Sequence, residues 1–178
     1  ARVADLLAAE QANLGAVDLV SATAEAIVRD VTFDVQTEQH GERVLTRLNE
    51  LADVTVVSAS DQVFLAHLGG KIRVQSKLPI TTRATLSMVY TPGVGRVCQA
   101  IAQDRHKVYS LTTKGNSVAI VTDGSAVLGL GNLGPEAALP VMEGKSMLFR
   151  ELAGIDAWPI CLNTQDPDEI VRIVQGIA

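Results

Sequence analysis

The chain has 178 residues, of which 47% are hydrophobic and 20% are charged. Its 15 basic residues against 20 acidic ones give a formal net charge of −5, which argues against a nucleic-acid binder, because such proteins carry a basic surface. No apolar run approaches the roughly 18 residues of a membrane span, and Cys98 and Cys161 lie too far apart for a CxxC zinc site or a disulfide framework, which fits a reducing, cytoplasmic setting.

Two helices are predicted in the first part of the chain. Apolar residues between Val3 and Leu14 share one helical face, and Gly15 suits the position just past a helix end. The second helix follows Thr37, whose hydroxyl can accept a hydrogen bond from the first helical turn. Its apolar face lies within residues 44–51 at helical spacing. Both helices therefore have one apolar side to bury.

Three strands accompany these helices. Residues 16–20 read as a strand, and so do residues 27–35, in which positions 31–35 alternate apolar and polar side chains as a half-buried strand does. Residues 54–57 resume this β character, and Gly69-Gly70 ends the unit. The order helix–strand–strand–helix–strand is that of a ferredoxin-like α+β layer without its first strand. We therefore expect a first domain over residues 1–70.

The second segment, residues 71–178, begins with extended and turn signals. The residue before a proline avoids the helical region, so Pro79 favours an extended chain over residues 78–82. The run Tyr90-Thr91-Pro92-Gly93 is typical of a turn, and its proline suits the first turn of a helix. That helix has an apolar face between Val94 and Ile101.

Strands and helices are expected to alternate in the remainder. Residues 117–121 read as a strand, Asp123-Gly124 as a hairpin turn, and residues 126–130 as the return strand. A helix over 135–152, a short strand over 158–162 and a last helix from the acidic cap at Asp166 complete the chain. The expected fold class is therefore α/β, with an α+β first domain.

The run Gly129-Leu130-Gly131-Asn132-Leu133-Gly134 matches the GxGxxG fingerprint of dinucleotide-binding folds. That fingerprint needs a strand before it, a helix that opens at it and an acid about 20 residues on, for which Glu151 or Asp156 is available. The helix is expected, but the preceding strand reads as the return arm of a hairpin, which is an antiparallel setting. The alternative is a structural crossing at which two backbones approach closely.

Two residues are candidates for proton transfer. Lys145 lies in an otherwise apolar helix, so it is either a snorkelling surface residue or a desolvated amine that can act as a general base. Tyr90 precedes a helix start, where a phenol can act as a general acid, or it is simply a half-buried tyrosine. The three histidines, His40, His67 and His106, show no metal-ligand spacing and are expected to be structural or exposed.

Taken in order, the motifs of the second segment resemble those of the malic enzyme family. They are Leu86 to Val94, Val121 to Gly124, Val127 to Pro135 and Pro140 to Lys145. The resemblance runs from about Gly69 to the C-terminus. The first segment looks like an ACT domain, a small βαββαβ regulatory module that some bacterial members carry, on its element order and on the runs Val28 to Val31 and Phe64 to Ile72.

The resemblance implies oxidative decarboxylation of L-malate to pyruvate and carbon dioxide, with NAD or NADP and Mg²⁺ or Mn²⁺ in the full-length protein. It implies that Lys145 is the general base on the malate hydroxyl and that Tyr90 protonates the enolpyruvate. It places the nucleotide in a later domain, so the glycine motif is expected to be a structural crossing and no residue here to bind cofactor or metal. Some members grip substrate with an arginine where this chain has Ser125 and Ala126.

The chain begins with Ala1 rather than Met, and both ends adjoin helical patterns. We therefore expect the N-terminal part of a longer enzyme, cut before its metal ligands and nucleotide domain and inactive alone. One alternative is a stand-alone regulatory or assembly module that binds a small effector. Another is a malolactic-type enzyme, which releases lactate. A homodimer is expected because an open sheet edge invites pairing, and neither nucleic acid nor membrane is an expected partner.

Overall fold

The computed structural model describes residues 2–177 and divides the chain into two compact units, Ala1–Asp61 and Gln62–Ala178. Among the described residues, no helix combines the length and the apolar character needed to cross a bilayer. Helix and strand both occur in each unit, so the expected α/β class is confirmed. Residues 62–70 fall in the second of these units.

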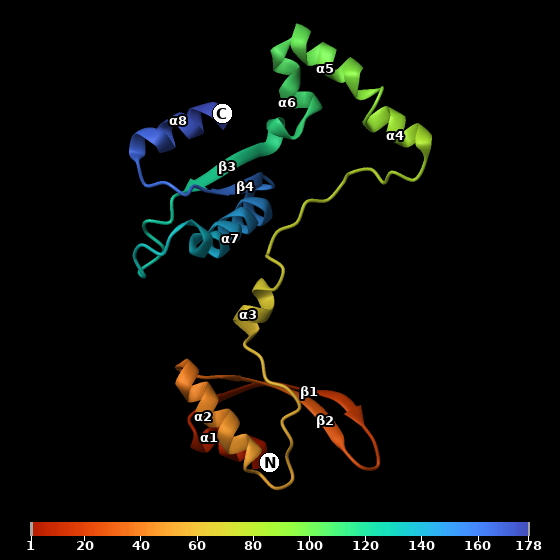
Figure 1. The fold of residues 1–178 in the computed structure, drawn as a ribbon. Coiled ribbons are helices and arrows are strands. Elements are labelled where there is room, and N and C mark those ends of the chain that lie inside the picture. The colour runs from red at the N-terminus through yellow and green to blue at the C-terminus, as the bar shows by residue number, and fades with distance from the viewer. Residues whose placement is uncertain (1, 178) are drawn as a thin grey trace. The chain divides into compact units, whose positions relative to one another are not determined.

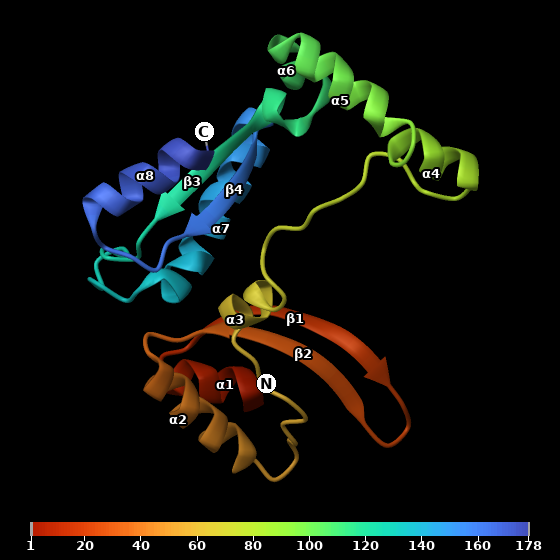
Figure 2. The same ribbon diagram turned by 45° about the horizontal axis from the view of Figure 1, so that its top comes forward.

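The first unit consists of two helices and one hairpin (Figures 1 and 2). In chain order these are α1 (Arg2–Ala9), β1 (Asn13–Ala22), β2 (Ile27–Asp34) and α2 (Glu38–Asn49). The strands pair antiparallel, with two irregularities in their register along β1. The core is formed by the helices and the adjoining part of the hairpin; it contains Leu7, Ala12, Val44 and Leu48, with Val31 and Phe33 packed against it.

The start of α2 follows the predicted capping rule, whereas the end of α1 does not follow its prediction. The Thr37 hydroxyl accepts a hydrogen bond from the His40 N–H at 3.1 Å. Helix α1 ends at Ala9, and Gln11 rather than Gly15 takes up the left-handed conformation, at φ 60°. Gly15 lies inside β1, where a Cβ would approach the Thr32 carbonyl oxygen to 3.2 Å. The glycine therefore serves a close approach between strands.

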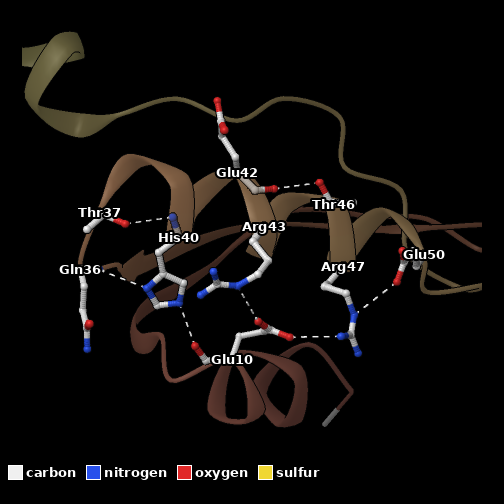
Figure 3. A network of polar contacts seen from close by, with 9 residues as sticks. All are labelled: Glu10, Gln36, Thr37, His40, Glu42, Arg43, Thr46, Arg47 and Glu50. Carbon is white, nitrogen blue, oxygen red and sulfur yellow. Dashed lines mark hydrogen bonds and ion pairs between the residues drawn. The ribbon is translucent and has the colours of Figure 1, made fainter.

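His40 joins α2 to the chain just after α1 (Figure 3). Its Nδ1 accepts from the Gln36 N–H at 3.2 Å, and its Nε2 lies 2.8 Å from the Glu10 carbonyl oxygen. The ring is therefore the neutral tautomer with its proton on Nε2. Both nitrogens are occupied and the side chain is buried, so His40 has the structural role expected for it.

The strand predicted over residues 54–57 is absent from the described part of the first unit. Val54 instead closes a turn, since its N–H donates to the Leu51 carbonyl at 3.1 Å. The only sheet of this unit within residues 2–61 is the pair β1–β2. A short run of β-favouring residues becomes a strand only where a neighbouring strand offers its hydrogen-bonding edge. The ferredoxin-like order is thus observed only as far as its helix–strand–strand–helix part.

The second unit is built around two parallel strands with a helix between them in the chain (Figure 1). Its elements are α3 (Gln62–His67), α4 (Arg83–Val89), α5 (Val94–Gln103), η1 (Arg105–Lys107), α6 (Val108–Leu111), η2 (Thr113–Asn116), β3 (Ser117–Thr122), α7 (Pro135–Ala153), β4 (Asp156–Cys161) and α8 (Pro167–Ile177). Helix α7 packs against both strands. Its buried positions Ala138, Met142 and Ser146 follow helical spacing and define the face turned to the sheet.

The hairpin predicted after Asp123 is wrong. Strand β3 pairs with β4 in parallel, from Ser117 opposite Asp156 to Thr122 opposite Cys161. Residues 126–130 form no strand and belong to the loop between β3 and α7. The order β3–α7–β4 is therefore a crossover unit, which parallel strands require because a tight turn cannot join them. Asp123-Gly124 has the composition of a hairpin turn, but it opens this longer loop.

Candidate functional site

The loop from β3 to α7 folds back on its own entrance. The N–H groups of Leu133 and Gly134, at the exit, both donate to the Gly124 carbonyl at 3.2 Å. Within the loop, the Val127 N–H donates to the Gly131 carbonyl at 2.8 Å, and the Val127 side chain is buried. The loop is thus a closed structure with its own hydrogen bonds, and it sets the point at which α7 begins.

A close backbone crossing lies at Gly124, outside the fingerprint itself. Gly124 has φ 73°, and a Cβ there would collide with the carbonyl group of Gly134 and lie 2.6 Å from the Pro135 nitrogen. A Cβ on Gly129, Gly131 or Gly134 would meet nothing within 4 Å among the described residues. The order here is strand, glycine loop, helix and parallel strand, as in a dinucleotide fold. The expected antiparallel hairpin before the glycine run is therefore no longer a reason against nucleotide binding.

Asp123 opens the loop with a carboxylate held by Ser125. Its Oδ1 accepts from the Ser125 N–H at 3.0 Å and from the Ser125 hydroxyl at 2.7 Å. Both hydrogen bonds lower the pKa of Asp123 below its ordinary 3.8, and the bond from the Ser125 N–H has the larger effect. Because the folded-state pKa is lowered, the stabilisation is present above the ordinary pKa and is lost as the pH falls through the folded-state pKa.

Replacing Ser125 with alanine is expected to raise the pKa of Asp123 toward its ordinary value, because the hydroxyl bond is removed while the backbone bond stays. The measurement is an NMR titration of the Asp123 carboxyl carbon in the two proteins. Ser110→Ala is a matched control, since the Ser110 hydroxyl donates to the Lys107 carbonyl and touches no carboxylate. An Asp123 titration curve that is the same in Ser125→Ala and in the parent would contradict the role given to the hydroxyl.

Tyr90 lies in the predicted turn, at the end of α4. Its N–H donates to the Leu86 carbonyl at 2.9 Å, and its carbonyl accepts from Val94 at 2.7 Å, so it connects α4 to α5. The next glycine, Gly93, has the Ser87 carbonyl oxygen only 2.5 Å from a Cβ built on it. The backbone around Tyr90 is therefore tightly packed, while its side chain is 66% exposed.

Lys145 is exposed on α7, beside the buried face formed by Ala138, Met142 and Ser146. It lines a shallow groove of about 480 Å³ together with residues from α3, α7 and the turn after α3. The groove residues are His67, Lys71, Pro140, Val141, Gly144, Lys145 and Leu148. Its side chain is exposed and reaches solvent through this groove.

The sequence did not point to Lys71, which is the most constrained polar side chain of this groove. Its N–H donates to the Glu143 Oε2 at 3.0 Å, and its ammonium donates to the Pro140 carbonyl at 2.8 Å. His67 Nε2 lies 2.8 Å from the same ammonium. The sequence carries no clear signal for this arrangement, because Lys71 lies beyond the end of α3 and its partners Pro140 and Glu143 are far along the chain.

The two predicted site residues are not joined by a direct contact in the structure. Lys145 lines the groove and Tyr90 does not, and neither side chain forms a hydrogen bond within residues 2–177. Nor does that part of the chain hold a group of three histidine, cysteine or acidic side chains arranged to bind a metal ion. No metal ligand is therefore assigned to the described residues.

Comparison with known proteins assigns the chain to a family. The profile of the malic enzyme N-terminal domain matches residues 69–172, more than half of the sequence. The chain belongs to the malic enzyme family. The resemblance expected from the motifs around Tyr90, the glycine loop and Lys145 is thereby confirmed, and all three lie inside the matched range.

Relatives named as malic enzymes are similar over most of this chain. An NAD-dependent malic enzyme of Geobacillus stearothermophilus is 53% identical over 91% of the chain, and NAD-dependent malic enzyme 1 of Bacillus subtilis is 44% identical over 99%. The crystal structure of an NAD-dependent malic enzyme from Thermotoga maritima is 49% identical over 67% of the chain, with a TM-score of 0.63. The chain spans only 34%, 40% and 34% of these three malic enzymes, respectively.

Proposed function

We propose that the complete protein containing this chain converts L-malate to pyruvate and carbon dioxide by oxidative decarboxylation. The observation that carries this proposal is the family match over residues 69–172, which includes Tyr90, the glycine loop and the Lys145 groove. Relatives named as NAD-dependent and NADP-dependent malic enzymes support a nicotinamide nucleotide as the hydride acceptor. A divalent metal, Mg²⁺ or Mn²⁺, would polarise the substrate oxygens in such a reaction.

Lys145 and Tyr90 are the two residues of this chain to which we assign proton transfers. The amine of Lys145, when neutral, takes the proton of the malate hydroxyl, which assists departure of the hydride from the same carbon. After carbon dioxide is lost, the Tyr90 phenol donates a proton to the enol carbon to complete pyruvate. Both side chains are exposed and without hydrogen-bond partners in residues 2–177, so both are available to a substrate.

The proposal is tested by expressing the complete reading frame and assaying it with L-malate, NAD or NADP, and Mg²⁺ or Mn²⁺. Reduced nucleotide, pyruvate and carbon dioxide should appear in equal amounts. The isolated chain Ala1–Ala178 should give none of them, because no metal site is found in its described part. Absence of malate-dependent nucleotide reduction in the complete protein would refute the proposal.

A malolactic reaction is the second candidate, and one relative favours it. A bifunctional malic/malolactic enzyme of Bacillus subtilis is 58% identical over 60% of this chain, which spans 26% of that enzyme. Analysis of the carbon product separates the two reactions, since the first gives pyruvate with net nucleotide reduction and the second gives lactate without it. Lactate as the main product from malate would favour the second candidate.

We also propose that the first unit has a regulatory or pairing role in a cytoplasmic homodimer. Its hairpin carries large apolar side chains that are exposed, including Leu19 at 63% and Val20 at 64%. Such a surface supports association or binding of a small effector. Light scattering of the complete protein tests the homodimer. Titration calorimetry with amino acids and carboxylate metabolites tests binding of an effector. A monomer that binds none of them would refute this role.

Replacing Tyr90 with phenylalanine in the complete protein is expected to slow pyruvate formation by about 10²-fold, because the general acid is removed while the ring stays. The measurement is kcat for pyruvate release at saturating malate. Tyr109→Phe is the matched control, since this tyrosine is also exposed, at 57%, and lies outside the Tyr90 turn. An unchanged kcat in Tyr90→Phe would leave the phenol without a catalytic role.

A further inference from the structure

The ammonium group of Lys71 is held in place at the edge of the Lys145 groove. It donates to the Pro140 carbonyl at 2.8 Å and to His67 Nε2, also at 2.8 Å. Gly144 leaves room for it, since a Cβ at that position would lie 3.6 Å from Lys71 Nζ. A lysine side chain normally loses much conformational freedom when it binds a ligand. At Lys71 two hydrogen bonds already restrict the side chain in the folded protein, so ligand binding has less freedom left to remove.

The positive charge of Lys71 is not paired with a carboxylate among the described residues. Both of its acceptors are uncharged, because an imidazole nitrogen can accept a hydrogen bond only in the neutral ring. The nearby Glu143 carboxylate is engaged by the Lys71 N–H at 3.0 Å and packs against Gly70. The ammonium therefore faces the groove as a half-buried cation with a third N–H left for a ligand.

The groove has the size and the charge for a small dicarboxylic acid. Its volume is about 480 Å³, within the usual range for small-molecule sites. The Lys71 ammonium and the Lys145 amine line it, and Val141 and Leu148 provide apolar wall. The resemblance implies that some family members bind substrate with an arginine where this chain has Ser125 and Ala126, so a different cation would take that role here.

We propose that Lys71 binds one carboxylate of the dicarboxylate substrate, beside Lys145 in the same groove. This inference rests on the proposed function, because it takes malate as the substrate whose hydroxyl meets Lys145. A charge-assisted hydrogen bond from a prepositioned ammonium is stronger than one between neutral groups. Lys71 therefore selects a substrate with a second carboxylate and has no part in the proton transfers.

The test is titration calorimetry of the complete protein with succinate, a dicarboxylate that cannot be oxidised at a hydroxyl, and with lactate, a monocarboxylate. Lys71→Gln removes the charge and keeps a neutral N–H donor on a side chain of similar length. It should weaken succinate binding by about 10-fold or more and leave lactate binding nearly unchanged. In malate turnover, KM should rise by a similar factor, with a smaller change in kcat.

Lys77→Gln is the matched control, because Lys77 is an exposed lysine of the same segment outside the groove, and it should leave both affinities unchanged. The proposal would be overturned if Lys71→Gln bound succinate as tightly as the parent protein does. It would also be overturned if Lys71→Gln lost succinate and lactate binding equally and melted at a lower temperature. Absence of succinate binding by the parent protein would overturn it as well. The calorimetry does not require turnover, so failure of the malate assay alone would refute only the proposed function.

Discussion

Replacing Lys145 with alanine in the complete protein is expected to lower the rate of malate oxidation by about 10²–10⁴-fold, the usual contribution of a positioned general base. The side chain is exposed on α7, and the neighbouring residues Met142 and Ser146 are the ones that pack on the sheet. The substitution should therefore remove the amine without disturbing the fold. The measurement is kcat for nucleotide reduction, with the melting temperature as the check on folding.

Two controls separate loss of the amine from loss of a surface charge. Lys107→Ala removes another exposed lysine, outside the groove, and should leave kcat unchanged. A small primary amine such as methylamine should partly restore the activity of Lys145→Ala, because the groove is open to solvent and the amine can take the vacated position. A rate in Lys145→Ala equal to that of the parent would rule out the lysine as the base.

Replacing Gly124 with alanine is expected to lower the free energy of unfolding of the protein by roughly 3 kcal/mol or more. Left-handed backbone strain and steric overpacking each cost about 1–3 kcal/mol. Both apply here, because Gly124 has φ 73° and its new Cβ would collide with the carbonyl group of Gly134. The clash cannot be relieved by rotating a side chain, since the atoms it meets are backbone. Urea unfolding of the complete protein measures the loss.

Gly129→Ala is the matched control for this prediction. It lies in the same loop, its backbone φ is not in the left-handed region, and a Cβ there would meet nothing within 4 Å among the described residues. Its effect should stay within about 0.5 kcal/mol, as is typical of an exposed substitution. Equal losses in the two variants would show that the whole loop is sensitive and that the crossing at Gly124 is not the cause.

Elements with their own local signals could be predicted from the sequence. The Thr37 cap of α2, the turn that begins at Tyr90 and the acidic start of α8 at Asp166 all appear where they were expected. Each depends on hydrogen bonds between residues a few positions apart, so the relevant partners are visible in the sequence. Helix α4 was missed although Thr82 caps it in the same way as Thr37 caps α2.

Strand pairing could not be predicted in this way, because the partner of a strand is not a property of the strand itself. The errors at residues 54–57 and 126–130 have this origin. At the first, β-favouring residues have no partner strand in the described part of the unit. At the second, Asp123-Gly124 suggests a hairpin, whereas the partner of β3 is supplied by β4, which follows only after all of α7.

Two residues of the candidate site were proposed from the sequence, and the signal for them was family resemblance rather than local hydrogen bonding. Tyr90 and Lys145 were assigned by resemblance to a family, since neither burial nor contacts distinguish them from other exposed side chains. Lys71 had no such precedent in the motifs. Its bond to Glu143 joins residues 72 positions apart, and the role proposed for it depends on a groove that exists only after the chain has folded.

The parallel pairing of β3 with β4 has a consequence for folding kinetics. The hairpin β1–β2 closes a short turn and can form within microseconds, as local pairs do. Ser117 can meet Asp156 only after the intervening chain has been brought back across the sheet, and such non-local pairing is slow. Since α7 is that connection, we expect substitutions that weaken α7 to lower the refolding rate of the second unit as well as its stability.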